Sequence, residues 1–266
     1  MSSNLSIFKG DYIPSECSIV FFPGCSLSGY SCEIVESTFN YLSSKIDNLG
    51  LIVGCCSKPS LDIKDTSKHE VMENNLKEKL YTKGIKKIIT ACSNCYMMFN
   101  NYKDIEVISL WQVLDNVMGD DFKGRGEGID LSITIHDPCP TRKEIIIHDS
   151  VRNILNSCGF KFQEFSNCRD KTICCGAKGM MLAKNPDIAK KLMKRRADSA
   201  STMRIVSYCE SCVQSMLIGG KESMHILDLL FNDKYIENKC KSQSLIPLKG
   251  HWMERRKTAL ITRSKK

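Results

Sequence analysis

The chain has 266 residues, 15 cysteines and a formal net charge of +8 at pH 7. A chain this long can bury a real core as one large domain or two small ones, so disulfide staples are not needed to explain the cysteines. The sequence shows no secretory signal and no apolar run near the ~20 residues of a membrane helix. We therefore expect a cytoplasmic protein without a transmembrane segment, whose cysteines serve metal or redox chemistry.

The positive charge is concentrated at the C-terminal end. Residues 249–266 hold seven Lys or Arg and one Glu, which leaves a net charge of only +2 on the other 248 residues. The body of the protein shows no basic face, so we expect no binding to nucleic acid. We predict that this basic tail is solvated and partly disordered, with docking to an acidic partner or an anionic membrane surface as the alternative.

The first half alternates strand-like and helical patterns, and each strand-like run leads into cysteine. SIVFFPG precedes Cys25, LGLIVG precedes the adjacent pair Cys55–Cys56, and IKKIITA precedes the Cys92-x-x-Cys95 pair. These β-branched, apolar runs predict buried strands that end in loops. Helices are predicted between them, one carrying Ile34, Phe39, Tyr41 and Leu42 and one over residues 67–82.

A glycine-rich, charged stretch over residues 119–130 follows, which we interpret as a linker. The second half then repeats the pattern. LSITIHDP precedes Cys139, and MRIVSY precedes the Cys209-x-x-Cys212 pair. Helical patterns follow Cys139, through Ile145, Val151, Ile154 and Leu155, and cover residues 186–200.

The cysteines of the two halves form one repeated pattern. The spacings are C-x29-CC-x35-CxxC and C-x34-CC-x33-CxxC, and the second copy has its adjacent pair at Cys174–Cys175. Strand–helix alternation predicts an α/β fold with two halves, each a small parallel sheet flanked by helices. The predicted domains are residues 1–120 and 121–248, followed by the basic tail at 249–266. Because loops at the carboxyl ends of parallel strands meet at one edge, we expect five cysteines to converge in each half.

Five thiolates exceed the four that tetrahedral zinc or an ordinary iron–sulfur cluster needs. Two adjacent sulfurs reach one centre only if the chain turns sharply, which a glycine with free φ allows. Gly176 follows the second pair, whereas Ser57 follows the first, so we expect either that the first turn is built differently or that its cluster is held less well. An iron–sulfur cluster is the favoured interpretation for both halves, with zinc in one half as the alternative.

The pattern C-x(n)-CCG-x(n)-C-x-x-C, present twice, resembles the cysteine-rich CCG domain family, which includes the B subunit of heterodisulfide reductase. The segments FFPGCSLS, ACSNCY, IHDPCPTRK, ICCGAKG and SYCESC carry the resemblance. It implies two α/β halves related by a pseudo-twofold axis, each with a non-cubane [4Fe-4S] cluster, which together cleave a disulfide. The implied ligands are Cys25, Cys55, Cys56, Cys92 and Cys95 for one cluster and Cys139, Cys174, Cys175, Cys209 and Cys212 for the other.

A disulfide reductase must supply two electrons and stabilise or protonate the thiolate products. We predict that His136 and Arg142, which flank Cys139, do the second, while the alternatives are a loop hydrogen bond for His136 and neutralisation of an anionic cluster for Arg142. The chain lacks the C-x2-C-x2-C-x3-C-P run of a ferredoxin. The resemblance therefore implies a ferredoxin-like or flavin-containing partner as electron donor, with the basic tail as a candidate docking segment.

Two other functions stay open at this point. One is an electron relay that serves a quinone or a dehydrogenase partner, and the other is a zinc-stabilised scaffold. The substrate of the first interpretation is a small disulfide or thiol. Five cysteines fall outside the repeat and are predicted to be small apolar core residues; they are Cys17, Cys32, Cys158, Cys168 and Cys240.

Overall fold

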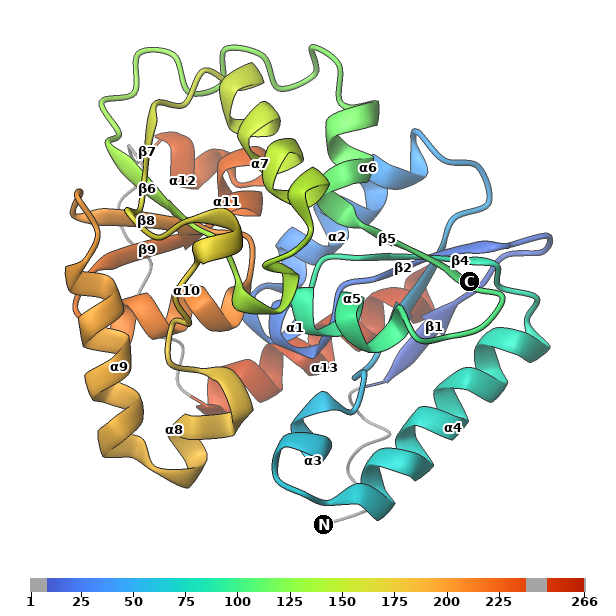
Figure 1. Ribbon diagram of the computed structural model, residues 1–266. Helices are drawn as coiled ribbons and strands as arrows, with labels where there is room; N and C mark the ends of the chain where they lie inside the picture. Colours follow the sequence, from blue (N-terminus) through green and yellow to red (C-terminus); the bar gives the residue numbers. More distant parts are fainter. Residues whose placement is uncertain (1–8, 238–247, 266) are drawn as a thin grey trace. The chain divides into compact units, whose positions relative to one another are not determined.

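The computed structural model describes residues 9–237 and 248–265 (Figure 1). Contacts within the chain divide it into two units, residues 1–110 with 246–266 and residues 111–245. Each unit has its own sheet with helices, so the expected α/β class is confirmed. Among the described residues, no helix combines the length and the apolarity that crossing a bilayer requires.

The first unit is built on a five-stranded sheet in the order β1-β3-β2-β4-β5. Only the edge strand β1 is antiparallel to its neighbour. The strands are β1 (Gly10–Tyr12), β2 (Ile19–Phe22), β3 (Gly50–Val53), β4 (Lys87–Thr90) and β5 (Glu106–Ser109). The helices are α1 (Cys25–Tyr30), α2 (Cys32–Ser43), α3 (Lys58–Asp62), α4 (Thr66–Thr82), α5 (Ser93–Phe99) and α13 (Leu248–Ser264).

The second unit has a four-stranded parallel sheet in the order β7-β6-β8-β9. Its strands are β6 (Ile133–His136), β7 (Phe162–Glu164), β8 (Arg204–Ser207) and β9 (Glu222–His225). Its helices are α6 (Leu110–Val117), which starts at the unit boundary, α7 (Ile145–Ser157), α8 (Met181–Lys184), α9 (Pro186–Asp198), α10 (Glu210–Ile218), α11 (Ile226–Phe231) and α12 (Asp233–Glu237).

The two sheets share one topology. The order β3-β2-β4-β5 in the first unit corresponds to β7-β6-β8-β9 in the second, and β1 is an addition to the first. In such open sheets the chain leaves the central strands in opposite directions, which opens a crevice beyond their carboxyl ends. That point lies between β2 and β4 in one unit and between β6 and β8 in the other, where strands lead into the repeated cysteines.

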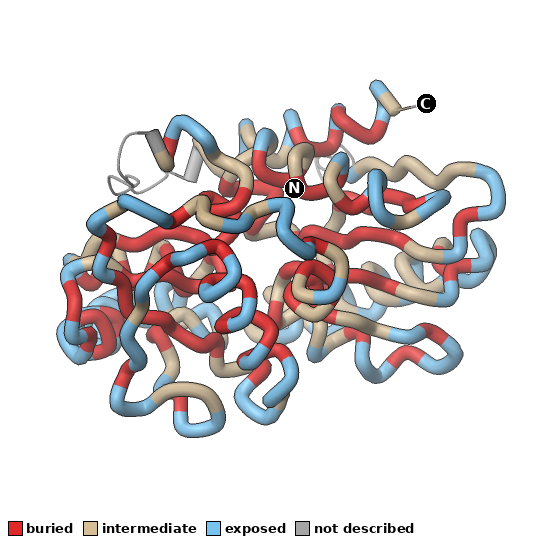
Figure 2. Tube along the Cα trace, turned by 90° about the horizontal axis from the view of Figure 1, so that it is seen from above, coloured by how far each residue is buried: buried red, intermediate tan, exposed pale blue. Residues whose placement is uncertain are grey.

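The strand patterns in the sequence reflect burial along these strands. All four residues of β3 and of β6 are buried, and so are three of the four in β2, β4 and β8. In Figure 2, buried stretches of the chain alternate with exposed ones. Continuous apolar runs of this kind are typical of parallel strands covered by helices on both faces.

The C-terminal segment is not the solvated tail that its charge predicts. It forms α13, which packs against α1, α2, β1 and β3 of the first unit (Figure 1). A stripe of small and apolar side chains, Thr258, Ala259, Ile261 and Thr262, is buried, while Arg256, Lys257 and Arg263 stay exposed. The charge count hides this amphipathic stripe, which is why the prediction of a disordered end is wrong.

The glycine-rich stretch over residues 119–130 is not a free linker either, because it is bonded to the second unit. Arg125 Nε donates to the carbonyl oxygen of Leu229 at 2.7 Å, and the amide of Gly126 donates to that of Cys158 at 2.7 Å. The contact boundary therefore falls at residue 110, ahead of the stretch that the sequence pattern marks as a linker.

Candidate metal centres

Five thiols of the first unit meet at the carboxyl ends of β2, β3 and β4. Cys25 begins α1 directly after β2, the adjacent pair follows β3, and the CxxC pair straddles the start of α5 after β4. Hydrogen bonds between neighbouring thiols join them into one chain, in the order Cys25–Cys55–Cys56–Cys95–Cys92. We call these five thiols the first set.

Five thiols of the second unit meet at the corresponding edge. Cys139 starts a 3-10 turn after β6, the adjacent pair lies in the loop between β7 and α8, and the CxxC pair straddles the start of α10 after β8. Their hydrogen-bonded order is Cys139–Cys174–Cys175–Cys212–Cys209. We call these the second set.

The two sets match position for position along their hydrogen-bonded chains. In both, the single cysteine contacts the first member of the adjacent pair, and the second member contacts the last cysteine of CxxC. All these cysteines are free thiols, and the innermost ones are almost completely buried: Cys56, Cys95, Cys175, Cys209 and Cys212. The structure thus brings together in each unit the five cysteines that the spacing predicts.

Crowding makes the thiols ionise unequally, because each contact favours one thiolate at the expense of its neighbour. Contact with Cys55 and burial raise the pKa of Cys25 well above its ordinary value, and contact with Cys174 does the same to Cys139. Hydrogen bonds from Cys55 and Cys95 lower the pKa of Cys56 to about 6. So many buried thiols in contact ionise together only if a cationic centre compensates their charge, which an iron-containing cluster does. The all-sulfur donor set fits such a centre.

Both adjacent pairs are followed by a left-handed residue. Gly176 has φ 96°, and Ser57 has φ 63° and ψ 0°. The expectation that the first turn is built differently is wrong, since the serine adopts the strained conformation itself. Its hydroxyl donates to the carbonyl oxygen of Cys56 at 2.6 Å, and its oxygen is hydrogen-bonded to Nδ1 of His69 at 2.6 Å. These two bonds offset the ~1–2 kcal/mol that a left-handed side-chain residue costs.

Glycine is also required on the other side of the first set. Gly24, which precedes Cys25, has φ 82°, and a Cβ atom there would lie 2.8 Å from Cβ of Cys92 and 3.3 Å from Sγ of Cys95. The β2–α1 loop therefore approaches the CxxC segment more closely than a side chain allows.

The two predicted catalytic residues lie in different environments. His136 ends β6 with no exposed surface, and burial, reinforced by Arg196, lowers its pKa to about 3. A neutral, buried imidazole favours a hydrogen-bonding role over proton delivery to a substrate. Arg142 is exposed, and its guanidinium donates to the carbonyl oxygen of Thr172 at 2.7 Å, so it braces the loop that carries Cys174.

Sequence reasoning missed the buried carboxylate that organises the second set. Asp137 accepts two hydrogen bonds from Arg152, at 2.6 and 2.8 Å, and others from the Tyr208 hydroxyl (2.8 Å) and the Arg169 amide (2.7 Å). Although burial raises its pKa, the bonds from Arg152 outweigh this and lower the pKa to about 2. Asp137 thus ties together the loops that hold Cys139, Cys174 and Cys209. Its place directly after a predicted strand was the available signal.

The first set is braced from α13 instead. Arg255 Nε donates to the carbonyl oxygen of Cys25 at 2.8 Å, and Thr258 Oγ1 donates to that of Ser28 at 2.9 Å. Gly29 permits this approach, because a Cβ there would lie 3.0 Å from both Arg255 Nε and His251 Nδ1. The helix that begins with Cys25 is therefore positioned by the last helix of the chain.

A cavity of about 300 Å³ borders the second set. Its lining includes Cys174, two arginines and two apolar side chains: Arg195, Arg196, Ile173 and Leu192. Cys174 is half-buried, so one thiol of the second set is open to a small molecule from this side. The cavity size falls at the lower end of the range usual for ligand sites.

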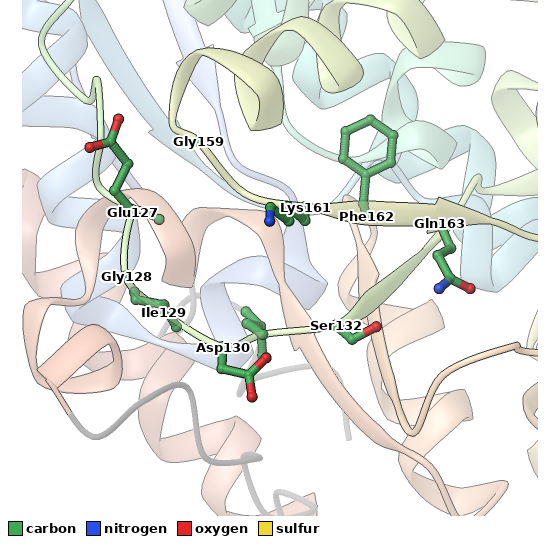
Figure 3. A pocket seen from close by; sticks show the side chains of 11 residues that line it. Glu127, Gly128, Ile129, Asp130, Ser132, Gly159, Lys161, Phe162 and Gln163 are labelled. Carbon is green, nitrogen blue, oxygen red and sulfur yellow. The ribbon is translucent and has the colours of Figure 1, made fainter.

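A larger cavity, of about 640 Å³, lies away from the cysteines (Figure 3). It is lined by residues 126–132, which lead into β6, and by residues around the start of β7, among them Glu127, Asp130 and Lys161. It sits at the amino ends of these strands, the opposite edge from the thiols. No cysteine is among its lining residues, so we do not assign it to the site.

The cysteines outside the repeat stay outside both sets. Cys17 and Cys158 are buried, and burial raises the pKa of each thiol. Cys32 and Cys168 are half-buried and take no part in the two hydrogen-bonded chains. Cys240 lies outside the described residues.

Comparison with known proteins agrees with the repeat. Residues 19–100 and 133–217 each match the cysteine-rich domain CCG, together more than half of the chain. The D subunit of the dihydromethanophenazine:CoB–CoM heterodisulfide reductase of Methanosarcina mazei is 26% identical over 239 residues, which cover 83% of this chain and 58% of that protein. The B subunit of the fumarate reductase (CoM/CoB) of Methanothermobacter marburgensis is 25% identical over 80% of this chain and 45% of its own length.

The EtfAB:quinone oxidoreductase of Syntrophomonas wolfei is 22% identical over 80% of this chain and 34% of its own length. The chain spans about half the length of the heterodisulfide reductase subunits that it matches. Among solved structures, a glutamate racemase from Bacillus anthracis aligns over 87% of this chain and 86% of its own, with 10% identity. The TM-score of 0.38 is too low to indicate a shared fold. The duplicated match places the chain in the cysteine-rich CCG domain family.

Proposed function

We propose that each five-thiol set holds an iron–sulfur cluster. We further propose that the chain is a subunit of an iron–sulfur oxidoreductase that reduces a disulfide, or oxidises thiols in reverse, with electrons from a partner protein. The observation that carries the proposal is the matched order of five contacting thiols at the same edge of both sheets.

The number and contacts of the thiols favour clusters over zinc. Tetrahedral zinc uses four ligands, and nothing in zinc chemistry requires two adjacent cysteines to turn toward one centre. In both units a left-handed residue follows the adjacent pair, and both members of each pair have a thiol partner outside the pair. The family resemblance adds the non-cubane [4Fe-4S] type to the proposal, with all five cysteines of each set as ligands.

Two one-electron centres in one chain match the two electrons that cleavage of an S–S bond consumes. In this proposal, the residues around the second set bind the substrate and stabilise the product. The cavity beside Cys174 admits a small molecule, and Arg195 and Arg196 line it with positive charge. Positive charge beside a cleaved disulfide stabilises the thiolate that forms there. The apolar walls, Ile173 and Leu192, suit the carbon chain of a small thiol.

The electrons come from a partner in this proposal. The names of several relatives describe subunits of larger reductases, and this chain matches about half of the length of the heterodisulfide reductase relatives. A ferredoxin-like or flavin-containing protein is the class of donor that fits. Purification of the chain with its neighbours under anaerobic conditions tests this, since recovery of the chain alone or only with copies of itself would contradict it.

A relay function is the second candidate. The similarity to an EtfAB:quinone oxidoreductase favours a chain that passes electrons to or from a quinone or a dehydrogenase. The two candidates differ in what reoxidises the reduced protein. We expect small disulfides to reoxidise it and a quinone analogue not to, in an anaerobic stopped-flow assay; the reverse result would favour the relay.

The decisive test of the metal centres is composition. Anaerobically reconstituted protein is analysed for iron, acid-labile sulfide and zinc, and its EPR spectrum is recorded after oxidation and reduction. Two clusters require about eight iron atoms and eight sulfides per chain. Zinc without sulfide would overturn the proposal in favour of a scaffold protein.

A further inference from the structure

Among the described residues, the second set has a buried cation beside it, whereas the first set has none. Arg196 of α9 is 3% exposed, and its guanidinium stacks on the ring of Phe165, with 3.7 Å between the guanidinium carbon and the ring centre. One of its terminal nitrogens donates to the carbonyl oxygen of Asn167 at 3.0 Å. Phe165 belongs to the same core cluster as Cys175, Cys209 and Cys212.

Arg196 also fixes the proton of His136. Its Nε–H donates to Nδ1 of His136 at 3.3 Å. A guanidinium only donates hydrogen bonds, so Nδ1 must be the unprotonated nitrogen and the ring proton must be on Nε2. Within the described part of the chain, Nε2 is buried and has no hydrogen-bond partner. A buried donor without a partner is rare and requires an explanation.

Sulfurs of the second set lie close to this ring and are the candidate acceptors. One ring nitrogen of His136 and the sulfurs of Cys175 and Cys212 all lie within 4.8 Å of one another. Thiolates and cluster sulfides are acceptors, and hydrogen bonds to them stabilise the more negative, reduced form of a cluster. The positive charge of Arg196 also stabilises the more negative, reduced form. Its effect is strong because the guanidinium is buried away from water.

The first unit has apolar side chains in these places. Phe22 stands three residues before Cys25, as His136 stands three residues before Cys139, and it packs edge-on against Phe99. The single buried residue of α4 is Leu80, whereas α9 buries Arg196. Arg255 lies beside Cys25 of the first set, but it is half-buried and its Nε is bonded to a backbone carbonyl.

We propose that His136 and Arg196 are positioning residues that give the second cluster a higher reduction potential than the first. This inference rests on the proposed function, because it requires a cluster at each set. The first electron delivered to the chain then rests on the second cluster, which is the one beside the cavity that Cys174 borders. The two halves are thereby unequal in role, because the second cluster holds the first electron and the first cluster supplies the second electron that cleavage of the disulfide consumes.

The test is a redox titration of the reconstituted full chain, followed by EPR. Each redox transition is assigned to one site with the variants Cys56→Ser and Cys175→Ser, which remove a thiol from the first set and the second set respectively. We expect the second site to titrate at the higher potential. His136→Phe introduces the residue that the first unit has at this place. This variant and Arg196→Gln should each lower the reduction potential of the second site by at least 59 mV, which is a tenfold change in the equilibrium constant for one electron. The first site should not move.

Two further variants separate charge from packing. Arg196→Lys keeps the charge and should retain a higher potential than Arg196→Gln. Lys190→Gln removes an exposed charge from the same helix at a position that does not line the cavity, and it should leave both potentials within a few-fold of the parent. If the second cluster does not assemble in His136→Phe, the Lys and Gln variants of Arg196 decide the matter.

Unchanged potentials in His136→Phe and Arg196→Gln would overturn the inference while leaving the clusters in place. Equal shifts of both sites, or a higher potential at the first site in the parent protein, would overturn it too. A parent protein that takes up no iron and sulfide contradicts the proposed function itself, so the two failures are distinguishable.

Discussion

The two units present the same five thiols in the same order but support them by different means. In the first, the thiols pack into an apolar cluster with Phe22, Leu80 and Phe99, and a helix from the far end of the chain braces the loop at Cys25. In the second, a buried ion pair between Asp137 and Arg152 links the loops. The arrangement of the thiols is thus repeated while the surroundings have diverged, and under our proposal the surroundings determine how stably each cluster is held and how readily it is reduced.

Removal of α13 should have the largest effect, because this helix supports the first set and not the second. A chain that ends at Pro247 loses the bonds from Arg255 and Thr258 to the backbone of α1. We expect it to retain iron at the second set and to lose it at the first, so that the iron content per chain falls by about half. Iron analysis with EPR checks this.

A point variant sharpens the same prediction. Arg255→Ala should weaken iron binding at the first set, whereas Arg256→Ala, which changes an exposed neighbour on the same helix, should not. Equal loss of iron from both units in the shortened chain would show that α13 does not act on the first unit alone.

The buried ion pair should matter only to the second unit. Asp137→Asn leaves the buried Arg152 with one carboxylate partner, Glu164, which it contacts at 2.7 Å. Loss of one member of a buried pair typically costs 3–5 kcal/mol, and because Glu164 remains we expect about 3 kcal/mol. Urea unfolding measures this, with Asp149→Asn as the matched control.

Asp149 pairs with Arg169 at the surface, with its side chain 52% exposed, so its variant should cost less than about 1 kcal/mol. Equal destabilisation by both variants would remove the special role of Asp137. Iron analysis of Asp137→Asn should show losses at the second set first.

The two units also differ in the residue that follows the adjacent cysteines. Gly176→Ala places a Cβ 2.9 Å from Cγ of Met193 and 3.1 Å from its backbone nitrogen, in a left-handed conformation. We expect a loss of about 2 kcal/mol in the free energy of unfolding. Thermal unfolding checks the value, and an unchanged midpoint would contradict the geometry.

The reciprocal change in the first unit should have the smallest effect. Ser57→Gly relieves the left-handed strain but removes the hydrogen bonds to the Cys56 carbonyl and His69. Because glycine also loses more chain entropy on folding, we expect a change within about 1 kcal/mol of zero. A loss above about 3 kcal/mol, measured by urea unfolding, would mean that His69 is essential to the first turn.

The sequence predicts much of this arrangement because parallel strands and metal ligands leave local signals. The runs before Cys25, Cys92, Cys139 and Cys209 become β2, β4, β6 and β8, and the helices over residues 67–82 and 186–200 become α4 and α9. The strand ends then bring the cysteines together by topology alone.

What the sequence does not predict depends on long-range contacts. The helix α13 looks like a charged tail until its buried stripe meets α1, and Arg196 looks like one of several basic residues on α9 until Phe165 and His136 surround it. The edge strands β1, β5, β7 and β9 also escape prediction, because β1, β5 and β7 are mostly not buried and β9 is largely polar, so none of them shows a continuous apolar run.

The central claim is that both thiol sets hold iron–sulfur clusters, and the most direct measurement is metal and sulfide analysis of the parent protein beside Cys56→Ser and Cys175→Ser. We predict about eight iron atoms and eight sulfides per chain in the parent and about four of each in either variant. A parent protein with zinc and no sulfide, or variants whose iron content equals that of the parent, would contradict the account.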